Sequence, residues 1–241
     1  MNSPLNLGKD WLLLTVNSMW GYRHLSPNTQ RLYSGAILGA VLAAIMWLTM
    51  RVHSFYVPLT VVLGCGLWGQ YEWWRMAKRK QKDRWFFVGA AYIALGTGAW
   101  IYLVHEQLWY VIFFVLGFCI VSDTAAYVVG SLVKGPKIFP TISPGKTWSG
   151  SVAGLIVASI AGTMWIGSCC DHSAFFVFGG CIVLGVCAQA GDALESVAKR
   201  YYGVKDSGAL LPGHGGVLDR IDSWLSVAMV VVGVGRWLCV L

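Results

Sequence analysis

The chain has 241 residues, of which 56% are hydrophobic and only 12% are charged, and it contains 13 Trp. Soluble domains usually carry about a quarter charged residues, so the composition excludes an ordinary soluble globular protein. The formal net charge of +7 would favour a nucleic-acid partner if the protein were soluble. On a bilayer protein such charge lies beside anionic lipid headgroups, so we expect membrane lipids and no nucleic acid as partners.

Residues 1–31 lack the short apolar core and the small-residue cleavage site of a signal peptide. We expect them to form a cytoplasmic or interfacial segment, in which Trp11–Trp20 is a partly amphipathic stretch at the membrane surface. The remaining residues, 32–241, are expected to form one transmembrane domain.

Seven apolar blocks follow one another in residues 32–241, each near the roughly 20 residues that a helix needs to cross a bilayer. None alternates polar and apolar residues as a barrel strand would. The sequence therefore predicts an all-α fold, a polytopic bundle of about seven spanning helices. The blocks are Leu32–Met50, Phe55–Trp74, Trp85–Val104, Leu108–Val133, Gly150–Gly167, Ala174–Ala193 and Ser223–Leu241.

The basic residues lie almost entirely in the segments on one side of these blocks. If the N-terminus is cytoplasmic, 16 of the 18 Lys and Arg residues fall in cytoplasmic segments, and only Arg51 and Arg236 fall outside. This asymmetry predicts a protein of the inner (cytoplasmic) membrane with a cytoplasmic N-terminus. Two long loops, 134–149 and 199–222, are then cytoplasmic.

Carboxylates interrupt the apolar blocks at three places. A carboxylate near the centre of a spanning helix costs about 2.5–3.5 kcal/mol on insertion scales, so it normally faces a polar cavity, a partner or an ion. Glu72 lies near the inner end of the second block, where an ion pair with Arg75 and a functional role are both open. Asp123 has no cation among its sequence neighbours, which favours a functional role. Asp192 and Glu195 are three residues apart and share one helical face.

The loop 199–222 combines three kinds of group that suit a metal–phosphate site. Its basic residues suit phosphate, its glycines let backbone N–H groups approach an anion, and it ends with two carboxylates three residues apart. Mg²⁺ commonly binds through one or two carboxylates and the phosphates of a substrate, whereas the His and Cys clusters of zinc or copper sites are missing. These residues are Lys199, Arg200, Lys205 and Arg220, then Gly213, Gly215 and Gly216 around His214, and Asp219 and Asp222.

The loop 134–149 contains Gly145-Lys146-Thr147, which are the last three residues of a Walker A motif. Pro140 stands where that motif requires its first glycine, and no strand is predicted before it, so the sequence argues against a P-loop. Lys146 is expected to contact phosphate as a point charge on a loop. His214 is either a turn residue or a substrate contact, and both interpretations are open.

The 27 residues from Ser196 to Asp222 closely resemble the signature of the phosphatidate cytidylyltransferase (CDP-diacylglycerol synthase) family, with its spacing intact. The N-terminal hundred residues match that family only in hydropathy. The chain departs from the family pattern at Gly145, where a basic or amide residue is expected, and at Ser149, where Glu is expected. The matching positions outside the signature are Asp192 and Glu195, then Ser143, Pro144, Lys146, Thr147, Trp148 and Gly150, and finally Asp123, Ala126 and Tyr127.

The resemblance implies transfer of CMP from CTP to phosphatidic acid, giving CDP-diacylglycerol and pyrophosphate in phospholipid biosynthesis. Both reactants are polyanions, so a divalent ion and several cationic side chains would offset their repulsion. Mg²⁺ is the expected cofactor, and whether a second, monovalent cation joins it is open. The resemblance also implies a homodimer.

The family pattern, carried over position by position, predicts the site residues. Asp192 and Asp219 are the leading metal ligands. The predicted catalytic residues are Asp219, Asp192, Lys199 and Arg220; the predicted metal ligands are Asp192, Asp219, Asp222, Glu195 and Asp123; and the predicted substrate-binding residues are Arg200, Lys205, His214, Gly215, Gly216, Lys146 and Ser143.

Two other classes of function are open at this point. A related CTP-dependent membrane enzyme, such as a polyprenol kinase or a cytidylyltransferase acting on ether lipids, would use similar groups. A transporter could use Asp123 and Asp192 as intramembrane ion sites. Against a transporter, the polar residues gather at one face of the membrane, and the two halves of the chain show no inverted repeat.

Overall fold

The computed structural model of the chain describes residues 56–79, 84–167, 173–208, 210 and 215–234, together with residues 40, 44, 48, 49 and 51. The predicted segment 1–31, almost all of the first apolar block and His214 lie outside the described residues.

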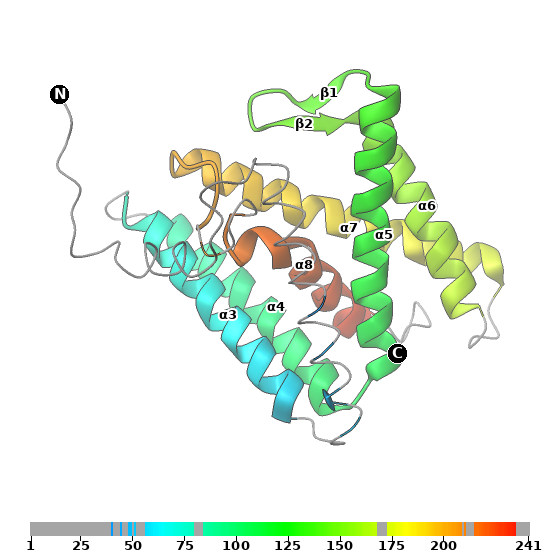
Figure 1. Cartoon of the computed structure of the whole chain (residues 1–241), viewed down its shortest axis with the longest axis horizontal. Helices are drawn as coiled ribbons and strands as arrows, with labels where there is room; N and C mark the ends of the chain where they lie inside the picture. Colours follow the sequence, from blue (N-terminus) through cyan, green and yellow to red (C-terminus); the bar gives the residue numbers. More distant parts are fainter. Residues whose placement is uncertain are drawn as a thin grey trace.

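Six helices make up most of the described chain, and each contains most of one predicted apolar block (Figure 1). Blocks two to six are confirmed as helices within a few residues. The largest difference is in the sixth predicted block, whose helix does not end at Ala193 but continues to Tyr201. The predicted site residues near the end of that block are therefore helical. The helices are α3 (Tyr56–Ala77), α4 (Trp85–His105), α5 (Trp109–Val133), α6 (Trp148–Ile166), α7 (Ala174–Tyr201) and α8 (Leu218–Val234).

Four of these helices, α4 to α7, are long and apolar enough to cross a membrane. A chain with several such helices is an integral membrane protein. The seventh predicted block corresponds to α8, which has 17 residues and begins earlier than predicted, at Leu218. The count of seven spans and the cytoplasmic N-terminus stay predictions.

The loop 134–149 departs from the all-α prediction, because it contains a β-hairpin. Strand β1 (Lys137–Phe139) pairs antiparallel with β2 (Ser143–Thr147), with Lys137 opposite Thr147 and Phe139 opposite Ser143. Three prolines within residues 136–144 disfavour a helix but are compatible with extended edge strands. The hairpin lies at the end where α5 stops and α6 begins (Figure 1).

The innermost helix is α8. It packs against α7, α4, α5 and α3, and its Val227, Ala228 and Val231 are fully buried. Trp100 of α4 donates a hydrogen bond from its indole to the carbonyl oxygen of Trp224, at 3.2 Å. The first turn of α8, which carries Asp219 and Asp222, is therefore held among the other helices.

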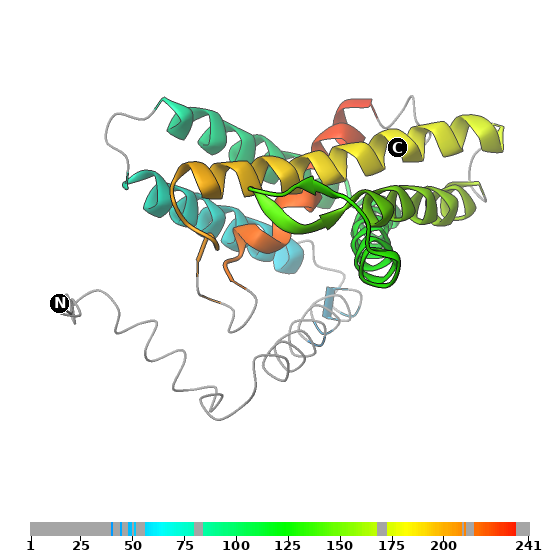
Figure 2. The same ribbon diagram turned by 90° about the horizontal axis from the view of Figure 1, so that it is seen from above.

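Helices α5 and α6 lie side by side in both views (Figures 1 and 2). Their contact depends on small residues spaced four apart, Gly150 and Gly154, which let the two backbones approach closely. A Cβ atom at Gly154 would lie 2.7 Å from the carbonyl oxygen of Ser122 and 3.0 Å from the Cβ atom of Ala126.

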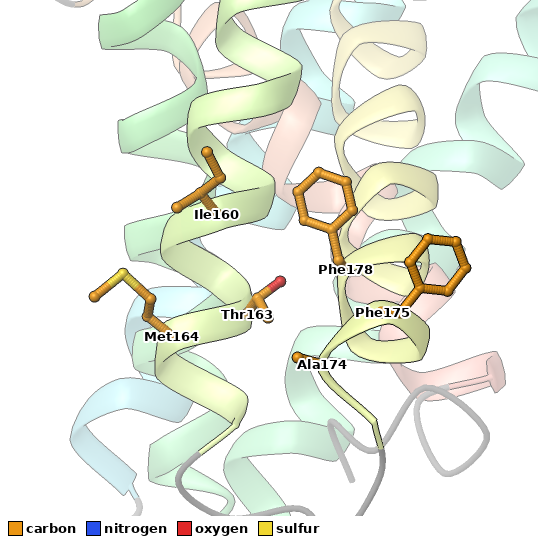
Figure 3. Close-up of a pocket in the computed structure, with 6 residues that line it drawn as sticks. All are labelled: Ile160, Thr163, Met164, Ala174, Phe175 and Phe178. Carbon is orange, nitrogen blue, oxygen red and sulfur yellow. The ribbon is translucent and has the colours of Figure 1, made fainter.

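An apolar pocket of about 550 Å³ lies between α6 and α7 at the end of α6 away from the hairpin (Figure 3). Its lining residues are Ile160, Thr163, Met164, Ala174, Phe175 and Phe178. None of them is ionisable, so this pocket is not a candidate for phosphate or metal chemistry.

We predict that Gly154→Ala destabilises the protein by about 1–3 kcal/mol, because the added methyl group meets the backbone of α5. The matched control is Gly117→Ala in α5, where a Cβ atom meets nothing within 4 Å. Thermal unfolding in detergent compares the two variants. Equal unfolding temperatures for Gly154→Ala and Gly117→Ala would contradict the close packing of α5 on α6.

Candidate active site

Three carboxylates meet where the C-terminal part of α7 packs on the start of α8. Asp192 and Glu195 lie three residues apart on α7, and Asp222 lies in the first turns of α8. One oxygen atom from each of the three lies within 4.8 Å of the other two. Glu195 and Asp222 are buried, whereas Asp192 is partly exposed. The structure therefore brings together the two acidic pairs that the sequence showed separately.

The donor set of this cluster fits a divalent cation. Oε1 of Glu195 is buried and accepts no hydrogen bond from the described residues, while Oε2 contacts the ammonium group of Lys199. A buried carboxylate oxygen without a partner is costly. Mg²⁺ prefers oxygen ligands and binds readily to carboxylates. The cluster thus has both the atoms and the unsatisfied charge that such an ion requires.

Lys146 reaches the cluster from the hairpin. Its Nζ atom lies 2.5 Å from Oδ2 of Asp192, and both side chains are partly exposed, at 29% and 36%. The hairpin is also tied to the C-terminal end of α7, because Arg200 donates a hydrogen bond from Nε to the carbonyl oxygen of Ile142 at 2.9 Å. Viewed from above, the hairpin crosses α7 (Figure 2). Ser143 lies on the same strand as Lys146.

Asp219 lies beside the cluster of three and has partners for both oxygens. Oδ1 is 2.5 Å from Nζ of Lys199, and Oδ2 accepts backbone hydrogen bonds from Gly216 at 2.7 Å and Ser207 at 2.9 Å. Burial would raise the pKa of Asp219, but the hydrogen bonds from Lys199 and Gly216 outweigh it and hold the pKa below its ordinary value. Asp219 is therefore a carboxylate in a network of donors, with Lys199 between it and Glu195.

Asp123 faces the same region from α5. Asp192, Lys146 and Arg220 all act on it electrostatically, and Asp123 in turn acts on Asp222. The structure thus places the predicted metal residues of α5, α7 and α8 in one region.

The other predicted substrate-binding residues differ in how they are placed. Arg200 donates to two backbone carbonyls, of Ile142 and of Val204, so in this structure its guanidinium group positions loops. Lys205 is exposed. Gly215 has a φ angle of +84°, and a Cβ atom there would lie 2.5 Å from Oδ2 of Asp219, so this position requires glycine.

Sequence reasoning missed Ser207 and Tyr92 at this site and left the role of Glu72 open. The carboxylate of Glu72 accepts hydrogen bonds from Ser207 and from the start of α8; among the described residues these contacts stand in place of the ion pair with Arg75. The Tyr92 hydroxyl donates to the carbonyl oxygen of Asp222 at 3.1 Å. Glu72 was visible as an ionisable residue in an apolar block, whereas no local pattern distinguished Ser207 or Tyr92.

The family profile and the relatives of known name both point to one family. The profile of the cytidylyltransferase family matches residues 84–237. A phosphatidate cytidylyltransferase of Rickettsia typhi is 32% identical over 229 residues, covering 89% of this chain and 96% of its own length. One from Staphylococcus saprophyticus is 39% identical over 156 residues, covering 61% of this chain and 59% of its own. One from Brucella suis is 42% identical over 110 residues, covering 46% and 41%.

We predict that Lys199→Met lowers the free energy of unfolding by about 3–5 kcal/mol, because it leaves the buried carboxylates of Glu195 and Asp219 without their shared cation. Thermal unfolding of the detergent-purified variant at neutral pH measures the loss.

The control for this experiment removes the charges together with the lysine. Lys199→Met combined with Glu195→Gln and Asp219→Asn is expected to recover most of the lost stability, since neither carboxylate partner of the lysine then carries a charge. An unfolding temperature of the single variant equal to that of the wild type would show that this ion-pair network does not stabilise the fold.

Proposed function

Because this chain belongs to the cytidylyltransferase family, we propose that it transfers the cytidylyl group of CTP to phosphatidic acid, forming CDP-diacylglycerol and releasing pyrophosphate. The relatives that match it over most of its length are named phosphatidate cytidylyltransferases. The observation that carries the proposal is the meeting of buried carboxylates and lysines at one end of apolar helices.

In the proposed reaction, a phosphate oxygen of phosphatidate attacks the α-phosphorus of CTP. The bond from that phosphorus to the bridging oxygen breaks, and pyrophosphate leaves with the electron pair. Both reactants are anions, so the main task of the protein is to hold them together and offset their charge. No covalent intermediate with the enzyme is needed.

Mg²⁺ is the proposed cofactor, and when bound it would neutralise charge on the phosphates of CTP. Asp192, Glu195 and Asp222 are its first proposed ligands, because their oxygen atoms already lie together. Asp123 stays a proposed ligand of second rank. Asp219, which the sequence predicted as a leading ligand, is now ranked with it, because Asp219 would have to exchange its contact with Lys199 for one with the ion.

The cationic side chains are proposed to bind the phosphates. Lys146 and Asp192 are partly exposed and lie beside the carboxylate cluster, so we propose that CTP approaches from the side of the hairpin. Lys199 is only 13% exposed and would oppose the charge that develops on the leaving group. Arg220 is exposed at the start of α8 and is proposed to contact a phosphate from the solvent side. Lys205 is exposed on the loop and is proposed to contact a phosphate from outside.

A site at the boundary between apolar helices and water matches the two substrates. Phosphatidate keeps its acyl chains in lipid while its headgroup reaches the carboxylate cluster, and CTP stays in water. We propose that this boundary is the cytoplasmic face of the inner membrane, in keeping with the asymmetry of the basic residues. A homodimer is proposed from the family resemblance alone.

The detergent-purified protein is expected to release pyrophosphate from CTP only when phosphatidate and Mg²⁺ are both present, and to form CDP-diacylglycerol. Chromatography of products from labelled CTP checks this. CDP as the nucleotide product would indicate a kinase instead, and solute uptake into sealed vesicles without use of CTP would indicate a transporter.

Asp222→Asn is expected to lower kcat about a hundredfold or more at saturating Mg²⁺, because Asn keeps the shape of the side chain but loses the charge that a cation requires. Glu106→Gln is the control, since Glu106 is exposed and lies at the C-terminal end of α4. Turnover of Asp222→Asn within twofold of the control would remove Asp222 from the metal site.

A further inference from the structure

We propose that Glu72 of α3 is a positioning residue for the cytidylyl transfer. Its carboxylate holds the loop between α7 and α8 and the first turn of α8, and thereby fixes Asp219 and Asp222 against the carboxylates of α7. The expected effect of Glu72 on turnover rests on the proposed function, whereas its contacts with the loop and with α8 follow from the structure alone.

The carboxylate of Glu72 is saturated with hydrogen bonds. Oε1 accepts from the indole N–H of Trp68 at 3.0 Å and from the backbone N–H of Val217 at 3.0 Å. Oε2 accepts from the backbone N–H of Leu218 and from the hydroxyl of Ser207, both at 2.9 Å. The indole N–H and the two backbone N–H groups can only donate, so the side chain acts as their acceptor, as an ionised carboxylate does. Glu72 is only 2% exposed, so its carboxylate depends on these protein donors and not on solvent water for its hydrogen bonds.

Two of these bonds cap a helix from a distance. The first N–H groups of a helix have no partner within it, and a negative charge near them is favourable. Such groups are usually capped by a side chain just before the helix. Here Val217 and Leu218 at the start of α8 are capped by a residue 145 and 146 positions earlier in the chain. The position of α8 therefore depends on α3.

Ser207 connects Glu72 to Asp219. Its hydroxyl oxygen lies 2.9 Å from Oε2 of Glu72 and 2.9 Å from Oδ2 of Asp219. A hydroxyl has one proton, so it donates fully to only one of the two carboxylates at a time. Asp219 in turn contacts Lys199, which contacts Glu195. A continuous polar network thus runs from α3 to the carboxylate cluster.

The loop is shaped to admit this carboxylate. A Cβ atom at Gly216 would lie 2.6 Å from Oε1 of Glu72, and one at Gly208 would lie 2.9 Å from its carboxyl carbon. Both glycines belong to the segment that resembles the family signature, whereas Glu72 lies outside residues 84–237, the part that the family profile matches. The site is thus completed by a helix that precedes the matched region.

The test compares Glu72→Gln with Gln70→Ala. Glu72→Gln keeps the shape but turns an NH₂ group toward N–H donors. Gln70→Ala removes the hydrogen bond from Gln70 to the carbonyl oxygen of Ala90, so it loosens α3 against α4 without touching the loop. For Glu72→Gln, we expect kcat to fall about tenfold to a hundredfold, as is usual when a residue supporting metal ligands is lost, with KM for CTP changed less than about threefold. Gln70→Ala is expected to keep wild-type kcat.

Hydrogen exchange separates this inference from the proposed function. In Glu72→Gln, amide exchange of residues 215–220 is expected to rise while α5 and α6 stay protected, whatever reaction the protein catalyses. Unchanged exchange there would show that Glu72 does not hold the loop. Raised exchange with unchanged kcat, or an equal loss of kcat in Gln70→Ala, would also overturn the proposal. A wild-type protein inactive with CTP and phosphatidate would contradict the proposed function and leave the exchange result to decide the contacts.

Ser207→Ala tests the same network if Glu72→Gln does not fold. It removes only the hydroxyl between Glu72 and Asp219. We expect kcat to fall about threefold to tenfold, the usual effect of losing one hydrogen bond, with KM for CTP unchanged. Wild-type kcat in Ser207→Ala would contradict a positioning role for this network.

Discussion

The carboxylates buried where α7 meets α8 repel one another, and the surrounding residues must offset this repulsion. Glu195 and Asp222 are buried within reach of Asp192, and Asp219 lies next to them. Like charges at such distances in an apolar interior are strongly unfavourable unless cations or donors balance them. Lys199 lies between Glu195 and Asp219, and Lys146 comes from the hairpin to Asp192. An oxygen of Glu195 still lacks a donor among the described residues, which is the opening that a divalent ion would fill.

The fold explains why these charges are tolerated at the end of apolar helices. The four helices long enough to span a membrane are mostly apolar, and the charged residues of the site lie where the hairpin and the α7–α8 loop meet α7. The central position of α8 brings its first turn against α7. Glu72 adds a contact from α3 to that turn, so elements from both halves of the chain determine where the carboxylates stand.

Hydropathy predicted the described helices well because the bilayer sets a length and a composition that single sequences reveal directly. It did not predict the hairpin, where pairing of Lys137 with Thr147 depends on a turn between two short extended segments. The resemblance found the acidic residues but not their pairing: that Asp219 contacts Lys199, twenty residues earlier, follows from how α7 packs on α8. The contact of Glu72 with Leu218 spans 146 positions, and no local pattern carries information about it.

The central claim is that Asp192, Glu195 and Asp222 together hold a divalent ion. The most direct measurement is a structure of the protein with Mn²⁺ in place of Mg²⁺, with anomalous scattering used to locate the ion. The account predicts one peak among these three carboxylates, about 2.0–2.2 Å from at least two of their oxygen atoms. A peak at another place, with these carboxylates bound only to lysines, would contradict it.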